Sequence, residues 1–75
     1  MTTPVAEQVL RFLAPRGALS FKELCEGTGL EPSWLNQALN ELRMARLVTA
    51  VSSPTANDRI ILLFTATRLG REWYT

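Results

Sequence analysis

The stretch of residues 20–48 constrains the fold most, because it carries the signals of two short helices, a tight turn and a strand. Ser20 and Glu23 have the spacing of a capping box, in which each side chain accepts a hydrogen bond from a backbone amide at the helix start. Glycine and threonine at 27–29 favour a turn, and Pro32 suits the first position of a second helix. These signals predict two helices, over about residues 21–27 and 32–45.

Helix and strand signals continue on both sides of this stretch. Thr3 and Pro4 have the chemistry of a helix cap and a first turn, and Pro15 ends the helix that follows. A very short strand fits at Ala18–Leu19. Two apolar segments flank a polar loop, expected over Ser52–Asp58, and predict a hairpin. The expected bounds are about 4–14 for the first helix, 47–66 for the hairpin and 68–74 for a last helix capped by Thr67.

Length and composition allow one small domain, which we expect to span residues 1–75. A chain of 75 residues that is 47% hydrophobic has enough apolar surface for a modest core. The single Cys25 forms no internal disulfide, which fits a reducing cytoplasm. No apolar run approaches the ~20 residues that span a bilayer, and no signal peptide is apparent. We therefore expect a cytoplasmic protein.

The residue types argue against catalysis and metal binding. The chain has no histidine, which excludes the Ser-His and Cys-His pairs of nucleophilic catalysis and metal sites built on histidine or paired cysteines. A glycine-rich phosphate loop is absent. Cys25 is interpreted as a small apolar residue, because Glu23 and Glu26 disfavour the thiolate that a redox sensor needs. We expect no enzyme, no catalytic residue, no metal and no cofactor.

The order of elements and two motifs resemble the winged helix-turn-helix domain. LSFKELCEGTGLEPSWLNQALNELRMARLV, at residues 19–48, resembles the helix-turn-helix and following strand of MarR-type and ArsR-type regulators of bacteria and archaea. TRLGRE, at 67–72, resembles the stretch that commonly follows their wing. The resemblance implies a mainly α fold with a small β-hairpin (α+β), in which a three-helix core carries a two-stranded wing and a short C-terminal helix.

One position departs from that family pattern. These domains usually carry glycine just after the third helix, where a left-handed residue closes the helix. This chain has Arg46 there. We expect either that the helix closes differently or that Arg46 adopts a strained backbone.

The helix expected over 32–45 has one apolar and one polar face at helical spacing. The apolar face consists of Leu35, Ala38, Leu39 and Leu42. The polar face consists of Ser33, Asn36, Gln37 and Asn40. Hydroxyls and amides read base edges in a DNA groove, and the resemblance implies that this is the recognition helix. The alternative is a solvated polar face without a ligand.

The other DNA-binding candidates are one aromatic residue and four cations. Trp34 borders the polar face, where it either contacts nucleic acid or covers the core edge beside the second helix. The cations either contact phosphate or serve as solubilising charge. They are Arg43 beside the polar face, Arg59 at the base of the wing, and Arg16 and Lys22 near the start of the second helix. The net charge of +1 predicts weak affinity for a monomer.

Apolar residues toward the C-terminus favour self-association. The strand expected over Arg59–Ala66 is apolar on both faces, and a two-stranded wing buries only one face on its own core. The dimerisation candidates are Ile60, Leu62, Trp73 and Tyr74. The alternative is that Trp73 and Tyr74 fold back on the core of the same chain.

These features predict a sequence-specific, duplex-DNA-binding transcription regulator of phage or prokaryotic type that acts as a homodimer. A two-fold dimer places its recognition helices about one DNA turn, roughly 34 Å, apart. No membrane and no small-molecule ligand is expected. The alternative function is a winged-helix protein–protein interaction module, such as an antirepressor or an inhibitor, with little or no DNA binding.

Overall fold

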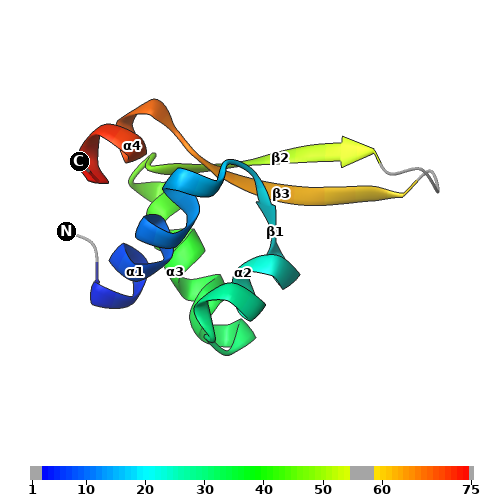
Figure 1. The fold of residues 1–75 in the computed structure, drawn as a ribbon, viewed down its shortest axis with the longest axis horizontal. Helices are drawn as coiled ribbons and strands as arrows, with labels where there is room; N and C mark the ends of the chain where they lie inside the picture. The colour runs from blue at the N-terminus through cyan, green and yellow to red at the C-terminus, as the bar shows by residue number, and fades with distance from the viewer. Residues whose placement is uncertain (1–2, 55–58, 75) are drawn as a thin grey trace.

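The computed structural model describes residues 3–54 and 59–74. Three helices form a bundle, and a long hairpin projects from one side of it (Figure 1). The arrangement confirms the expected α+β class, a three-helix core with a wing and a short last helix. The elements are α1 (Pro4–Leu13), a 3-10 turn (Ala14–Arg16), β1 (Leu19–Ser20), α2 (Phe21–Thr28), α3 (Pro32–Met44), β2 (Val48–Pro54), β3 (Ile60–Ala66) and α4 (Arg68–Tyr74).

The first three helices bury their apolar faces against one another. α1 is capped by Thr3, whose hydroxyl accepts a hydrogen bond from the amide of Ala6 at 3.2 Å. α2 has the predicted capping box, with Ser20 and Glu23 each accepting from the backbone amide of the other. The buried residues of the bundle are Ala6, Val9, Leu10, Leu13, Leu24, Leu35, Ala38, Leu39 and Leu42. The four α3 residues predicted to be apolar core are therefore core.

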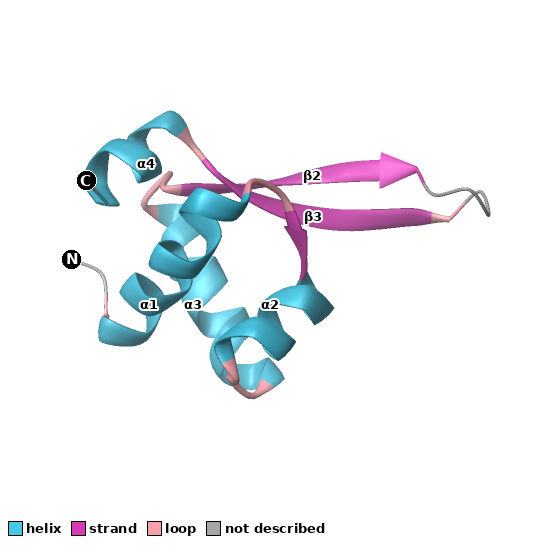
Figure 2. Cartoon of the chain, in the orientation of Figure 1, coloured by secondary structure: helices cyan, strands magenta, loops and turns pink. Residues whose placement is uncertain are grey.

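β3 is the central strand of an antiparallel sheet of order β1-β3-β2. β2 pairs with it from the Val48–Ala66 pair at the base to the Pro54–Ile60 pair at the far end. β1 pairs with only two residues in the middle of β3. The base of the hairpin covers the bundle, whereas its outer half extends beyond the bundle into solvent (Figure 2). The hairpin residues buried on the bundle are Val48, Phe64 and Ala66.

The hairpin is longer than the sequence predicts. A loop is expected over Ser52–Asp58, but Ser52–Pro54 pairs with Ile60–Leu62 as strand, so that part of the prediction is wrong. The apolar β3 strand supplies a continuous ladder, and pairing across strands overrides the weak strand preference of serine. Pro54 is tolerated because it lies at the end of an edge strand. Residues 55–58 lie outside the described part of the chain.

The turn after α3 is tied to the start of α4. Arg46 has a φ of 63°, so this non-glycine residue adopts the strained left-handed backbone. The Thr67 hydroxyl donates to the Arg46 carbonyl at 2.7 Å, and the Thr67 amide donates to the Leu47 carbonyl at 2.9 Å. Thr67 also caps α4 by accepting from the amide of Gly70 at 3.1 Å. We call the two hydrogen bonds from Thr67 to Arg46 and Leu47 the α3–α4 latch.

Gly70 allows this close approach. It is buried, and a Cβ atom at its position would collide with the backbone carbonyl of Leu47. Only glycine lets α4 lie this close to the start of β2. The spacing of threonine and glycine in residues 67–70 therefore serves the junction between α4 and the α3–β2 turn.

Candidate nucleic-acid interface

α3 presents a polar stripe to solvent, made of Ser33, Asn36, Gln37 and Asn40. All four side chains are exposed and lie opposite the buried face of the helix. None of them is hydrogen-bonded to another residue that the structure describes. Their amides and hydroxyl can therefore be used fully by a ligand. Asparagine and glutamine can form paired hydrogen bonds with adenine, and serine can bond with either partner of a base pair.

One side of the polar stripe borders a shallow recess between α3 and β2. The recess has a volume of about 560 Å³ and is lined by Asn40, Arg43, Met44, Val48 and Thr49. An amide, a guanidinium and a hydroxyl are thus brought together on one open surface. These groups are suited to base edges and phosphate oxygens.

Thr49 is a member of this surface that sequence reasoning missed. Its neighbours in β2, Val48 and Ala50, point toward the bundle and are buried or half-buried, whereas Thr49 is exposed. The alternation of a strand could have revealed this placement, because consecutive side chains point to opposite faces. The missing information was the position of that face beside α3.

The other side of the polar stripe faces the start of α1. Trp34 is 53% exposed and lines a small hollow with Gln37, Glu41 and two residues of the α1 start, Thr3 and Val5. The sequence interpretation put Trp34 beside the second helix, whereas the hollow that Trp34 lines in the structure includes residues at the start of the first helix. Trp34 and Glu41 are seven positions apart and so share one side of α3.

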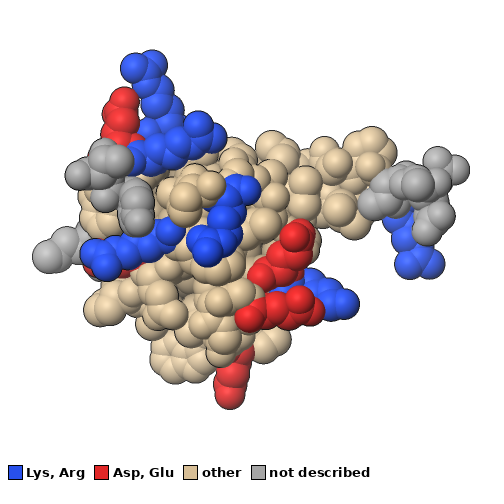
Figure 3. All heavy atoms as spheres, viewed as in Figure 1, with Lys and Arg blue, Asp and Glu red and all other residues tan. Residues whose placement is uncertain are grey.

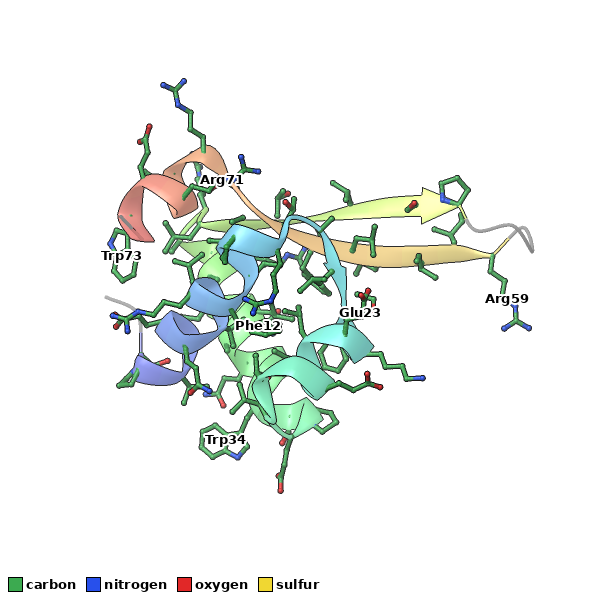
Figure 4. The ribbon with its side chains drawn as sticks, in the orientation of Figure 1. Phe12, Glu23, Trp34, Arg59, Arg71 and Trp73 are labelled. Carbon is green, nitrogen blue, oxygen red and sulfur yellow. The ribbon has the colours of Figure 1, made fainter. Side chains whose placement is uncertain are left out.

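The four candidate cations are spread over the molecule. Arg43 lines the recess beside the polar stripe, and Lys22 is exposed in the first turn of α2. Arg59 is expected at the base of the wing, but it lies at the far end of the wing (Figure 4). The reason is that β3 begins at Ile60 and runs from that end back to the bundle. The positive charge at the stripe itself therefore comes mainly from Arg43.

Arg16 is engaged by the end of α1. Its guanidinium lies 3.9 Å from the ring centroid of Phe12 and donates to the Phe12 carbonyl at 2.7 Å. It lines a separate hollow with Glu23 and Glu26, whose carboxylates repel phosphate. Arg16 is thus a weaker phosphate-binding candidate than the sequence suggests.

Three of the dimerisation candidates, Ile60, Leu62 and Trp73, do not form one patch. Ile60 and Leu62 are exposed on the outer wing, and Trp73 lies at the opposite end of a molecule 39 Å long (Figure 4). Trp73 is half exposed and lines a hollow with Met44 and Leu69, so it covers its own core only in part. Tyr74 is the last residue of α4.

The described residues offer hydrogen bonding and charge, without a metal centre. No group of three histidine, cysteine, aspartate or glutamate side chains in residues 3–54 and 59–74 could hold a metal ion. Among the described helices, none combines the length and the apolar character that crossing a membrane requires. Cys25 is a half-buried free thiol on α2.

The fold matches solved structures of winged-helix regulators of the MarR family, as the sequence resemblance implies. A ZitR variant from Lactococcus lactis superposes with a TM-score of 0.81 at 22% identity, over 99% of this chain. BpsR from Bordetella bronchiseptica matches with a TM-score of 0.80 at 25% identity over 96% of this chain. RV1404 from Mycobacterium tuberculosis matches with a TM-score of 0.83 at 27% identity over 95%.

The chain has about half the length of these neighbours. It covers 49% of the ZitR variant, 53% of BpsR and 47% of RV1404. No protein-family model and no curated protein matches the sequence. The shared region is therefore a winged helix-turn-helix domain.

Proposed function

We propose that this protein binds duplex DNA sequence-specifically and regulates transcription, with the polar stripe of α3 as the reading surface. The observation that carries the proposal is an exposed row of amides and a hydroxyl on α3, in a fold shared with transcription regulators. Ser33, Asn36, Gln37 and Asn40 contact base edges, and Arg43 contacts phosphate beside them. Trp34 adds packing at the edge of the stripe.

The wing and α2 contribute phosphate contacts in this proposal. Arg59 at the far end of the wing reaches the backbone away from α3, and Lys22 contacts it near the start of α2. Because Arg59 lies far from the polar stripe, it contacts a different part of the duplex from the residues of α3. With so few cations a single copy binds weakly, and a second copy raises the affinity for a palindromic site.

A small-molecule effector deserves a test beside DNA. The BpsR structure concerns regulation of that protein's DNA binding by 6-hydroxynicotinic acid, which weighs against the expectation of no ligand. In this chain a hollow of about 720 Å³ lies between α1, α3 and α4. Glu7, Met44, Leu69 and Trp73 are among its lining residues. Screening for a shift in DNA affinity is the direct way to find such an effector.

A protein-interaction module is the second candidate function. The observation that favours it is the exposed apolar surface of the wing, where Ile60 is 75% exposed. The scarcity of cations at the polar stripe favours it as well. Under this alternative α3 binds no DNA, and the wing binds another protein.

A mobility-shift titration separates the two functions. The chain is mixed with a random duplex pool at two salt concentrations, and bound duplexes are recovered and amplified to find a preferred sequence. DNA binding predicts a retarded species that weakens steeply with salt, since each phosphate contact adds about 0.9 to the salt slope. No retarded species at low salt refutes the DNA function and supports the protein-interaction module.

Arg43→Ala tests the assigned contact within that experiment. It is expected to weaken binding to all sequences and to lower the salt slope by about one unit. Arg11→Ala is the matched control, because Arg11 is exposed on α1 and paired with Glu7 at 2.8 Å. An equal loss in both variants would mean that the cations act through overall charge.

A further inference from the structure

The three amide side chains of the polar stripe lie close together on α3. Asn36 directly precedes Gln37, and Asn40 follows Gln37 by nearly one helical turn. All three are exposed. At a rise of about 1.5 Å per residue they span roughly 6 Å along the helix, which is about two base-pair steps of ~3.4 Å. An α3 that enters the major groove therefore brings the amides to bases within a window of about three base pairs.

A carboxamide distinguishes adenine from guanine by its donor and acceptor. It has one NH₂ group that donates and one oxygen that accepts. Adenine presents the matching pair in the major groove, the N7 acceptor and the N6 amino donor, whereas guanine presents two acceptors, N7 and O6. Against guanine the amide oxygen would face an acceptor and lose its hydrogen bond, which is costly once water is excluded. Asn36, Gln37 and Asn40 therefore favour adenine.

Groups that would favour a G·C pair are kept out of the centre of the stripe. The charged residues of α3 are Glu41 and Arg43. A carboxylate can accept from the amino group of cytosine, but Glu41 accepts from the Thr3 amide at 2.7 Å and from the Thr3 hydroxyl at 3.0 Å, which holds it toward α1. An arginine can donate to both acceptors of guanine, but Arg43 lies in the recess at the edge of the stripe.

We propose that the polar stripe reads adenine, so that the preferred duplex carries a run of about three A·T pairs where α3 enters the major groove. Gln37 and Asn40 each bind N6 and N7 of one adenine, and Asn36 binds a neighbouring one. Arg43 holds the adjacent phosphate. The inference deepens the proposed function, on which it rests, because it names the class of base pair that the reading surface selects.

The wing offers little support for the other physical origin of an A·T preference. A·T tracts also have a narrow minor groove, which attracts inserted arginine and lysine side chains. Neither β2 nor β3 contains a charged residue, and Figure 3 shows the uncharged surface of the wing between the bundle and its far end. The preference is therefore expected to come from the major groove, and the experiment must separate the two grooves.

Inosine·cytosine pairs make that separation. They present the acceptors of guanine in the major groove but keep the minor-groove pattern of A·T. Each A·T pair of the duplex recovered from the random pool is replaced in turn, and affinity should fall about 5- to 150-fold at two or three neighbouring pairs. A preferred duplex of G·C pairs, or unchanged affinity at every replaced pair, overturns the inference and leaves the DNA function standing. Absence of binding to any duplex refutes the DNA function and the inference together.

Replacing one atom of the DNA assigns the contacts. In 7-deazaadenine a C–H group replaces N7, so each replaced adenine that the stripe reads should weaken binding by the parent protein. In Gln37→Ala the penalty should vanish at one adenine, and in Asn40→Ala at another, because the partner of N7 is already gone. Gln8→Ala is the matched control, since Gln8 is exposed and lines a hollow of α1 residues alone. Penalties in both α3 variants equal to those of the parent refute the adenine contacts.

A change of specificity is the most demanding test. Gln37→Arg supplies two donors, which suit the two acceptors of guanine, so repeating the selection should replace one A·T pair of the preferred duplex by G·C. Gln8→Arg adds the same charge on α1 and should raise affinity without changing the selected sequence. Circular dichroism verifies that both variants are folded. If folded Gln37→Arg selects the parent sequence, position 37 reads no base and the proposal is wrong.

Discussion

α3 and the outer half of β3 are both rich in aliphatic residues, yet they use them in opposite ways. In α3 the aliphatic residues lie on one face and are buried, and the polar residues lie on the other. In Ile60–Leu62 aliphatic residues occupy both faces and are exposed. The α3 pattern is completed within the chain, whereas the β3 pattern lacks a counterpart among the described residues.

The difference shows what hydrophobic periodicity reports. It reports which side of an element avoids water, and it identifies the covering element only where the chain folds that element against it. For α3 the cover is the bundle. For the outer wing, no element among the described residues covers the apolar side chains of Ile60–Leu62.

The largest expected effect on stability comes from truncating an aliphatic residue of the bundle. The matched truncation in the outer wing should have little effect. Leu35→Ala should lower the free energy of unfolding by about 2–5 kcal/mol, because it leaves a cavity in the bundle. Leu62→Ala should change it by less than about 0.5 kcal/mol, since the side chain is half exposed. Urea denaturation of dilute protein measures both. Equal losses would mean that the wing is packed as tightly as the bundle.

A substitution at the close contact between Gly70 and the Leu47 carbonyl should destabilise the fold almost as much as a cavity in the bundle. Gly70→Ala drives a methyl group against the carbonyl of Leu47 and should cost about 1–3 kcal/mol. Leu69→Ala, at the exposed neighbouring position, is the control and should be near neutral. Thermal unfolding measures stability, and amide exchange at Thr67 reports whether α4 separates. Unaltered stability of Gly70→Ala would contradict the close approach.

Substitutions on the polar face of α3 should change DNA recognition and leave stability almost unchanged. Asn40→Ala and Gln37→Ala should each cost about 1–3 kcal/mol on the preferred duplex and much less on random duplex. Competition titrations with both duplexes measure the ratio. Equal losses on the two duplexes for Gln37→Ala would contradict its base-reading role. Gln37 lies on the α1 side of the polar stripe and Asn40 on the β2 side, so comparing the two variants also shows which edge of the stripe enters the groove.

The smallest effect is expected at Arg46. Arg46→Gly relieves the left-handed backbone but raises the entropy of the unfolded chain, so stability should change by about 0–1 kcal/mol in the stabilising direction. Arg46→Val should be less stable than the parent, because a β-branched residue tolerates this conformation poorly. Differential scanning calorimetry of the three proteins gives the order. Greater stability of Arg46→Val would contradict the positive φ.

The elements most predictable from the sequence are those with local signals. The capping box at Ser20 and the spacing of Leu35 and Leu42 depend on neighbours a few residues away, so the sequence reveals them. The length of β2 depends on its pairing with β3, so Ser52–Pro54 was wrongly predicted as loop. Its polar residues gave no local sign of strand.

The candidate site was predictable in its chemistry and less so in its geometry. The polar face of α3 follows from helical spacing and is exposed as expected. The place of Thr49 beside α3, the position of Arg59 at the far end of the wing and the stacking of Arg16 on Phe12 depend on tertiary contacts. None of these contacts has a signature within a short window of sequence.

The α3–α4 latch has a mechanical consequence. Thr67 holds the carbonyls of Arg46 and Leu47 at 2.7 and 2.9 Å, and these carbonyls belong to the turn that ends α3. A displacement of α4 must therefore either break both hydrogen bonds or carry the end of α3 with it. Anything that pulls on the last helix is transmitted along a stiff connection to the helix that carries the polar stripe.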